Sequence, residues 1–121
     1  MIIRKLSDCS EIIAADKSRL RELLHPERDY RFPGRYSLAH STIPPNQKSL
    51  MHRLNSDEVY FIILGKGIVH IDNESVEVGA NDTIEIPANS QQWIENITDK
   101  DLVFLCIVDP AWRLEDEKVL E

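Results

Sequence analysis

Two side chains near the middle of the sequence, His52 and Glu58, are the strongest candidates for chemistry. An imidazole and a carboxylate are good ligands for transition metals, and a carboxylate without a metal can serve as a general base. Tyr60 follows Glu58 by two positions, so both side chains share one face if this segment is a strand. The Tyr60 hydroxyl could then donate a hydrogen bond to a substrate, or the ring could simply fill the core.

The other histidines and the two cysteines are weaker candidates. We expect His40 and His70 on the surface, although His40 could face inward as a replacement ligand. His25 precedes a proline and is expected to cap the end of a helix. Cys106 lies in a wholly apolar segment and is expected to be an inert core thiol, while Cys9 has neither a nearby partner nor the spacing of a metal site.

Motifs of competing enzyme classes are not recognisable. We find no Ser–His–Asp arrangement, phosphate-binding loop or dinucleotide fingerprint. The adjacent acids Asp57 and Glu58 point to opposite faces of a strand, which excludes them as a glycosidase pair. Arg53 and Trp93 fall on the outward side of their strands by the same alternation.

The elements that would position these residues are mostly short strands. From about residue 36 apolar side chains recur with a period of two, and Gly, Pro, Asn and Asp residues separate the segments. This pattern predicts an antiparallel sandwich or barrel. The segment SRLRELLHP at 18–26 has leucines at helical spacing and predicts a helix that ends at Pro26. The charged tail is expected on the surface or packed back through Trp112.

Several predicted strands are apolar on both faces, as in EVYFIIL at 58–64 and LVFLCIV at 102–108. A strand with one solvated face would alternate cleanly between apolar and polar residues. The outer face must therefore meet another sheet, the N-terminal segment or a second subunit. We predict a homodimer, with cover from within the chain as the alternative.

The composition indicates one folded domain and argues against two kinds of partner. A chain of 121 residues with 42% hydrophobic residues fits a single domain, 1–121, with a substantial core. Its net charge of −7 repels phosphate backbones and anionic membranes, so no nucleic acid and no membrane is expected as a partner. The start of the chain lacks the apolar run of a signal peptide, and we expect a cytoplasmic protein.

The central segment resembles the first sequence motif of the cupin family. That motif reads Gly, five residues, His-x-His, three or four residues, Glu, six residues and Gly. At the same spacing this sequence has Asn46, His52, Leu54, Glu58 and Gly65. The first His, the Glu and the last Gly are kept, and Leu54 stands in place of the second His.

A later segment resembles the second cupin motif, which reads Gly, five residues, Pro-x-Gly, two residues, His, three residues and Asn. Here the corresponding residues are Asn81, Pro87, Asn89, Gln92 and Asn96. Gln92 replaces the metal-binding His. The two motifs occur in order over residues 46–96, and the flanking strands extend the resemblance to most of the chain.

Three glycines of the cupin motifs are replaced by asparagine, at positions 46, 81 and 89. Glycine is favoured at such turns because it accepts a positive φ. Asparagine is the non-glycine residue that tolerates left-handed backbone best. We therefore expect the backbone of the cupin fold to survive these replacements.

The resemblance implies an all-β cupin fold, a double-stranded β-helix or jelly-roll barrel, here with a short N-terminal strand and helix extension. Carried over position by position, the cupin metal site becomes His52, Glu58 and Gln92. Such a set could hold a divalent transition metal (Mn, Fe, Ni, Cu or Zn). The alternative is a site without metal, in which these residues hydrogen-bond to one another and line a pocket.

Cupins carry many functions, so the resemblance implies a short list rather than one reaction. We expect a metal-dependent enzyme of the dioxygenase, lyase or isomerase type that acts on a small oxygen-rich substrate, with Glu58 and Tyr60 as candidate catalytic residues. The alternative is a metal-free module that binds a small sugar or acid without turning it over. A purely structural dimer with a filled barrel is the third possibility.

Overall fold

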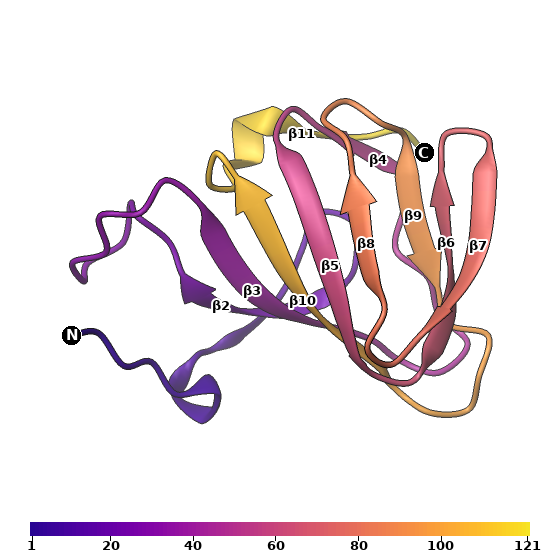
Figure 1. Ribbon diagram of the computed structural model, residues 1–121, viewed down its shortest axis with the longest axis horizontal. Coiled ribbons are helices and arrows are strands. Elements are labelled where there is room, and N and C mark those ends of the chain that lie inside the picture. Colours follow the sequence, from indigo (N-terminus) through magenta and orange to yellow (C-terminus); the bar gives the residue numbers. More distant parts are fainter.

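The computed structural model describes all 121 residues as two antiparallel β-sheets whose inner faces enclose a barrel (Figure 1). The first sheet has six strands in the order β1 (Glu11–Ile13), β2 (Arg19–Leu24), β3 (Ser37–Ile43), β10 (Leu102–Asp109), β5 (Asp57–Leu64) and β8 (Thr83–Ile86). The second has five, in the order β11 (Glu117–Val119), β4 (His52–Leu54), β9 (Gln92–Glu95), β6 (Lys66–Ile71) and β7 (Glu74–Gly79). This architecture confirms the expected all-β cupin fold.

Helical structure is limited to two single-turn 3-10 helices, η1 (Leu6–Asp8) and η2 (Leu114–Asp116). None of the helices has the length and apolar character needed to cross a bilayer.

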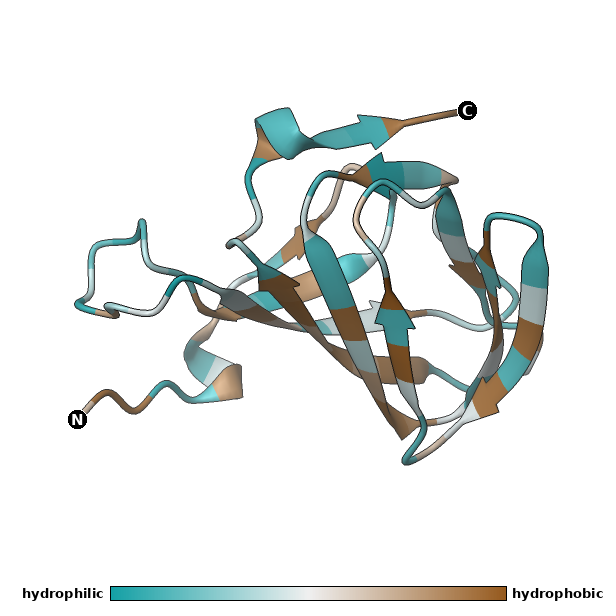
Figure 2. Ribbon diagram, turned by 45° about the horizontal axis from the view of Figure 1, so that its top comes forward, coloured by the Kyte–Doolittle hydropathy of each residue, from teal (hydrophilic) through white to brown (hydrophobic).

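The hydrophobic core lies between the two sheets and follows from strand alternation. Along β5, Glu58, Tyr60 and Ile62 are buried, whereas Phe61 and Ile63 on the other face are 39% and 42% exposed. The largest fully buried apolar side chains come from both sheets and their connections: Ile43, Ile62, Ile86, Ile94 and Leu102. Each such burial contributes about 1.5–3 kcal/mol to folding. Figure 2 shows the hydrophobic residues concentrated along the central strands of the first sheet.

The segment predicted as a helix is a strand, so that part of the prediction is wrong. Arg19–Leu24 forms β2 and pairs antiparallel with both β1 and β3. Its residues alternate: Leu20 and Glu22 line the barrel cavity, while Arg19 and Arg21 share the outer face. Leucine, arginine and glutamate favour helix only weakly, and the backbone bonds to two neighbouring strands override that preference.

The backbone angles at the turns confirm that asparagine can take the place of the motif glycines. Asn46, Asn81 and Asn89 all adopt positive φ, at 58°, 74° and 69°. Gly65, the motif glycine that is kept, has a φ of 89°, and a Cβ there would collide with the backbone of Asp101. Asparagine replaces glycine where only the dihedral angle is demanding, and glycine remains where space is also missing.

Candidate functional site

A cavity of about 660 Å³ opens into the barrel. Its inner wall comes from the sheets and includes His52, Glu58, Tyr60 and Cys106. Its outer wall comes from the N-terminal part of the chain, from Arg4 to Tyr30. The N-terminal extension therefore completes the cavity rather than standing apart from it. The volume lies within the range of small-molecule sites in proteins.

His52 on β4 is buried at 2% exposure and points one ring nitrogen into this cavity. Its Nδ1 lies 2.7 Å from the backbone oxygen of Leu50. A carbonyl can only accept, so Nδ1 carries a proton, and Nε2 is the ring nitrogen that faces the cavity. Nε2 faces two carboxylates, at 3.6 Å from Asp16 Oδ2 and 3.9 Å from Glu117 Oε1.

Each of the two carboxylates accepts hydrogen bonds through one of its oxygens, while its other oxygen accepts none. Asp16 Oδ1 accepts hydrogen bonds from the backbone N–H of Ser18 at 3.0 Å and from its hydroxyl at 2.6 Å. Glu117 Oε2 accepts from the indole N–H of Trp112 at 3.3 Å. The remaining oxygens, Oδ2 and Oε1, are those that face His52. Orientation of a ligand through its second polar atom is typical of metal centres.

These three side chains could hold a metal ion. The ligand atoms of Asp16, His52 and Glu117 all lie within 4.8 Å of one another. Atoms that share one ion at about 2 Å lie roughly 3–4 Å apart, so the observed separations need only small adjustments. The set of one imidazole and two carboxylates suits a divalent first-row transition metal.

A second cluster, centred on Glu58, lies beside the first. Gln92 Nε2 donates to Glu58 Oε1 at 2.7 Å, and Cys106 Sγ donates to Oε2 at 2.9 Å. Tyr60 donates its hydroxyl proton to Gln92 Oε1 at 3.1 Å. Every donor in this chain of hydrogen bonds points toward Glu58, and each carboxylate oxygen keeps a second lone pair. Glu58 is therefore the acceptor at the end of this chain of hydrogen bonds.

Burial and mutual repulsion dominate the electrostatics of the cavity. Burial raises the pKa of Glu58, and the nearby Asp16 raises it further. Three neighbours oppose this shift: Cys106 and Gln92 through their hydrogen bonds, and His52 through its charge when protonated. Burial also raises the pKa of Glu117, and Asp16 raises it further. These carboxylates thus destabilise each other's charged forms, as expected for like charges in a low-dielectric site.

Burial likewise raises the pKa values of Tyr60 and Cys106 well above their ordinary values, and Glu58 raises both further. Cys106 accordingly remains a thiol that donates to Glu58 and not a nucleophilic thiolate.

The candidates predicted from the sequence fall into both clusters. His52 faces Asp16 and Glu117, whereas Glu58 and Gln92 hydrogen-bond directly to each other, with Tyr60 one step away. A shared metal site of His52, Glu58 and Gln92 remains a prediction.

Sequence reasoning missed Asp16 and Glu117. Asp16 lies in the connection between β1 and β2, and Glu117 begins β11 in the charged tail, which pairs with β4. Only the Asp-x-Ser pattern of residues 16–18, which favours a side-chain hydrogen bond back to the chain, could have drawn attention to either acid.

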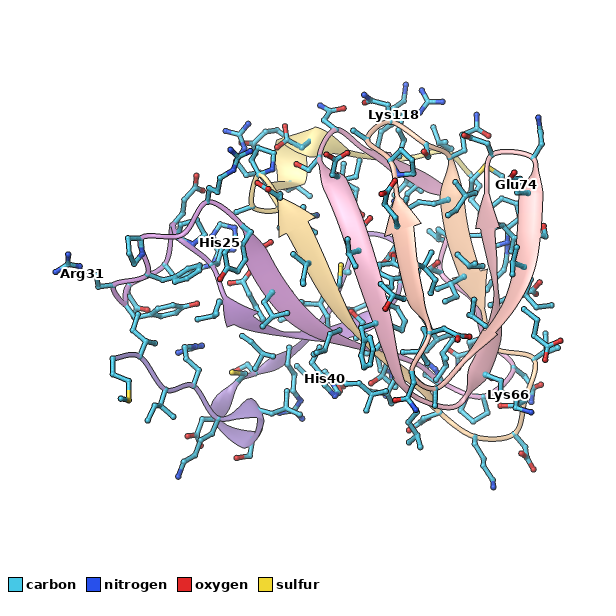
Figure 3. All side chains as sticks on the ribbon, viewed as in Figure 1. His25, Arg31, His40, Lys66, Glu74 and Lys118 are labelled. Carbon is cyan, nitrogen blue, oxygen red and sulfur yellow. The ribbon has the colours of Figure 1, made fainter.

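The remaining histidines stand outside the cavity site, and Figure 3 shows two of them, His25 and His40, well separated from each other. His25 is fully buried and caps no helix; its Nδ1 accepts from Glu27 N and its Nε2 donates to the oxygen of Trp112 at 2.7 Å. His40 pairs with Leu105 on the outer face of the first sheet.

The chain belongs to the cupin family, because the cupin domain model matches residues 39–108. It is 40% identical to the uncharacterized protein MJ1618 of Methanocaldococcus jannaschii, over 90% of this chain and 86% of that protein. An oxalate-binding protein of Thermotoga maritima is 30% identical over 58% of this chain and 59% of that protein. Among solved structures, the plu4264 protein from Photorhabdus luminescens superposes with a TM-score of 0.77 at 28% identity, covering 96% of this chain and 91% of that one.

Proposed function

We propose that this protein is a metal-dependent cupin enzyme, of the dioxygenase, lyase or isomerase type, that acts on a small oxygen-rich substrate in the cavity. The observation that carries the proposal is the charge of the site. The carboxylates of buried Asp16 and of Glu117, whose side chain is 7% exposed, face the single imidazole of His52, and the buried carboxylate of Glu58 lies in the neighbouring cluster. Buried charges are expensive unless they are paired or bind a metal.

The residues fit a divalent cation. Asp16 Oδ2, His52 Nε2 and Glu117 Oε1 would hold it, because each is free of other hydrogen bonds and faces the other two. When bound, a divalent transition metal supplies a Lewis acid that polarises substrate oxygens. The alternative ligand set predicted from the sequence adds Glu58 and Gln92, which would then exchange their mutual hydrogen bond for the ion.

Glu58 is the residue we propose as the general base. Its hydrogen bonds from Gln92 and Cys106 fix the carboxylate in one orientation while leaving lone pairs that could accept a proton from substrate. Burial raises the pKa of Glu58, so its carboxylate is a stronger base than that of an exposed glutamate, which suits proton transfer. Tyr60, hydrogen-bonded to Gln92, would orient that amide and fill the inner end of the cavity.

An oxygen-rich substrate is favoured by the character of the cavity and by one relative. A chelating acid or enol could place oxygens near the proposed ion while the rest of the molecule lies along the apolar wall of Leu54, Ile94 and Phe104. The Thermotoga maritima relative is named for its binding of oxalate, a small dicarboxylate.

The test is elemental analysis of the protein purified without a His tag or chelator. Near-stoichiometric Mn, Fe, Ni, Cu or Zn is expected in the parent protein and should be lost in His52→Ala, Asp16→Asn and Glu117→Gln. Asp8→Asn is the matched control, because Asp8 lines the outer cavity but lies outside the cluster. Loss of metal in Glu58→Gln with retention in Asp16→Asn would instead assign the ligand set predicted from the sequence.

A metal-free binding module is the second candidate, and one observation favours it. Glu58, Gln92, Tyr60 and Cys106 satisfy one another by hydrogen bonds without any ion. No metal in the parent protein, and no uptake during reconstitution with each metal, would support this candidate. Ligand screening by thermal shift with small acids and sugars would then replace enzyme assays.

We also propose a homodimer formed through the outer face of the first sheet. Phe61, Ile63 and Ile107 on this face are 39%, 42% and 41% exposed, and β1 and β2 extend the sheet edge instead of covering the face. A second copy would bury this apolar surface, which the sequence predicted to be covered.

The charges on this face favour one arrangement of the two copies. Arg19 and Arg21 lie on β2 near one edge, and Glu85 lies on β8 at the other edge. A two-fold axis in the interface and parallel to the strands places β2 of each copy opposite β8 of its partner. An axis across the strands would place like charges together. Phe61→Glu should give a monomer by light scattering, whereas Val76→Glu on β7 should leave the dimer intact.

A further inference from the structure

The outer face of the second sheet carries a chain of three polar side chains that the cavity does not use. His70 on β6 lies between Ser75 on β7 and Glu95 on β9. Its Nδ1 is 2.7 Å from Ser75 Oγ, and its Nε2 is 2.8 Å from Glu95 Oε1. The three strands are neighbours in the sheet (Figure 1). The structure thus contains a Ser–His–Glu arrangement that the sequence analysis did not recognise.

The hydrogen bonds determine which nitrogen is basic. The ionised carboxylate of Glu95 can only accept, so Nε2 carries the proton of the neutral ring. Nδ1 then has a lone pair, and Ser75 must donate its hydroxyl proton to it. This is the relation of nucleophile, base and orienting acid found in serine hydrolases, with the two ring nitrogens exchanged.

The imidazole is held rigidly in this orientation. The rings of His70 and Trp93 stack with their centroids 4.3 Å apart and an interplanar angle of 10°. The His70 side chain is only 15% exposed, whereas Ser75 is exposed at the surface. The base is therefore fixed and shielded while the hydroxyl it serves can be reached from solvent.

The hairpin also provides a backbone donor next to the hydroxyl. β6 and β7 are joined by the two residues Asp72 and Asn73, so the pair Ile71–Glu74 closes the turn by hydrogen bonds. The next pair, His70–Ser75, is then of the non-hydrogen-bonded kind, in which side chains approach most closely. Because β7 is the last strand of the sheet, the N–H of Ser75 points to the open edge. It could stabilise negative charge on the carbonyl oxygen of an acyl group whose carbon is bonded to Oγ.

We propose that Ser75 is an acyl-accepting nucleophile and that this face hydrolyses small activated esters. Ser75 Oγ forms a bond to the acyl carbon as its proton passes to His70 Nδ1. The ester C–O bond then breaks, and Nδ1 gives that proton to the leaving oxygen, which departs as an alcohol or phenol. Water then attacks the acyl carbon and gives one proton to Nδ1. The bond between the acyl carbon and Oγ breaks, and Nδ1 returns the proton to Oγ, which leaves the free serine and a carboxylic acid. Because Ser75 is exposed at the surface, small esters of varied acyl groups can reach its hydroxyl and are the substrates we propose.

This second site is independent of the cavity. Gln92 and Ile94 of β9 point inward and are buried, whereas Trp93 and Glu95 belong to the outer face. Ester hydrolysis should accordingly persist in the presence of a chelator and in the His52→Ala variant, whatever the outcome of the metal analysis.

The experiment is hydrolysis of p-nitrophenyl acetate by the full chain, with intact-mass and peptide analysis of the acetylated protein. Acetylation at Ser75 is expected, and the rate should fall about a hundredfold in Ser75→Ala and in His70→Gln. Glu95→Gln keeps the shape of the side chain but can donate to Nε2, which moves the ring proton to Nδ1, and should lower the rate similarly. Ser7→Ala is the matched control, an exposed serine without an imidazole partner.

Two outcomes would overturn the proposal. If Ser75→Ala keeps the rate while His70→Gln loses it, the imidazole reacts by itself and the serine is not a nucleophile. If acetyl groups accumulate at lysines or the N-terminus and all four variants react alike, the three side chains only hold the hairpin together.

Discussion

His52 and His70 lie on opposite faces of the same sheet, and each contacts carboxylate, yet the two sites are suited to different chemistry. His52 donates through Nδ1 to a backbone carbonyl and directs Nε2 at two carboxylates. His70 is bound through Nε2 to one carboxylate and receives a hydroxyl proton at Nδ1. The partner of the first nitrogen decides what the second can do.

Burial separates the two sites further. The inner site holds several carboxylates away from water, so an added cation would relieve their repulsion. The outer site has one carboxylate per imidazole, and the Glu95 side chain is 32% exposed. Its charge is already balanced when His70 takes up a proton. The inner site is therefore suited to a metal and the outer one to proton transfer.

Replacing each of the two histidines by alanine, in separate variants, tests this comparison most strongly. His52→Ala should lower the affinity for Mn²⁺ or Zn²⁺ by more than about a hundredfold, since it removes a ligand and not merely its support. His70→Ala should leave that affinity unchanged. Titration calorimetry on the metal-free protein measures both, and equal losses in the two variants would contradict the assignment of the metal to the inner site.

The residues that orient the inner carboxylates should have the next largest effect. Ser18→Ala removes the 2.6 Å hydrogen bond to Asp16, and Trp112→Phe removes the donor to Glu117. Each should weaken metal binding about 10–100-fold. Ser41→Ala is a suitable control, because Ser41 is buried and lines the cavity without touching the cluster. Unchanged affinity in both orienting variants would mean that the metal binds elsewhere.

Leu54→His distinguishes the two proposed ligand sets. Leu54 is 3% exposed and stands where cupins have a second histidine, two residues after His52. If Glu58 and Gln92 share the ion with His52, the new imidazole should tighten binding several-fold, measured by competition with a chromogenic chelator. If Asp16 and Glu117 are the ligands, the change should give no gain and should lower the melting temperature, because it buries a polar ring in the core.

Most of the barrel could be predicted from local sequence because its rules are local. Period-two alternation predicted the strands from β3 to β10 but not β11 in the tail. The asparagines at turns were expected to take positive φ, as Asn46, Asn81 and Asn89 do. The hydrogen bond between Glu58 and Gln92 could be anticipated because both residues stand at motif positions with unchanged spacing. A metal shared by His52, Glu58 and Gln92 stays a prediction.

The missed residues depend on pairings between distant segments. Asp16 reaches the cavity only because β2 adds to the sheet edge beside β3, and Glu117 only because the tail pairs with β4. Likewise Glu95 meets His70 through the register of β9 against β6, in which His70 is opposite Trp93. No local pattern specifies such registers; they are decided by which strands bury the most surface together.

The smallest predicted effect is the pH dependence of stability in the metal-free protein. Burial raises the pKa values of Glu58 and Glu117 above those of the unfolded chain. A group whose pKa is raised by folding contributes stability that is fully present below its pKa in the unfolded chain. This contribution is lost as the pH rises through its pKa in the folded protein. The melting temperature of the metal-free protein should therefore increase by a few degrees as the pH falls from about 7 to about 5.

Two matched measurements by calorimetry attribute that increase to the inner site. Glu58→Gln removes one of the two groups, so its melting temperature should depend less on pH than that of the parent protein. Saturation with metal should reverse the trend, because the ion favours the ionised carboxylates and protons compete with it. Ser75→Ala on the outer face should follow the parent curve. An identical pH dependence in Glu58→Gln and the parent would show that Glu58 is already as well stabilised in the fold as in water, which would remove its share of the electrostatic argument for a cation.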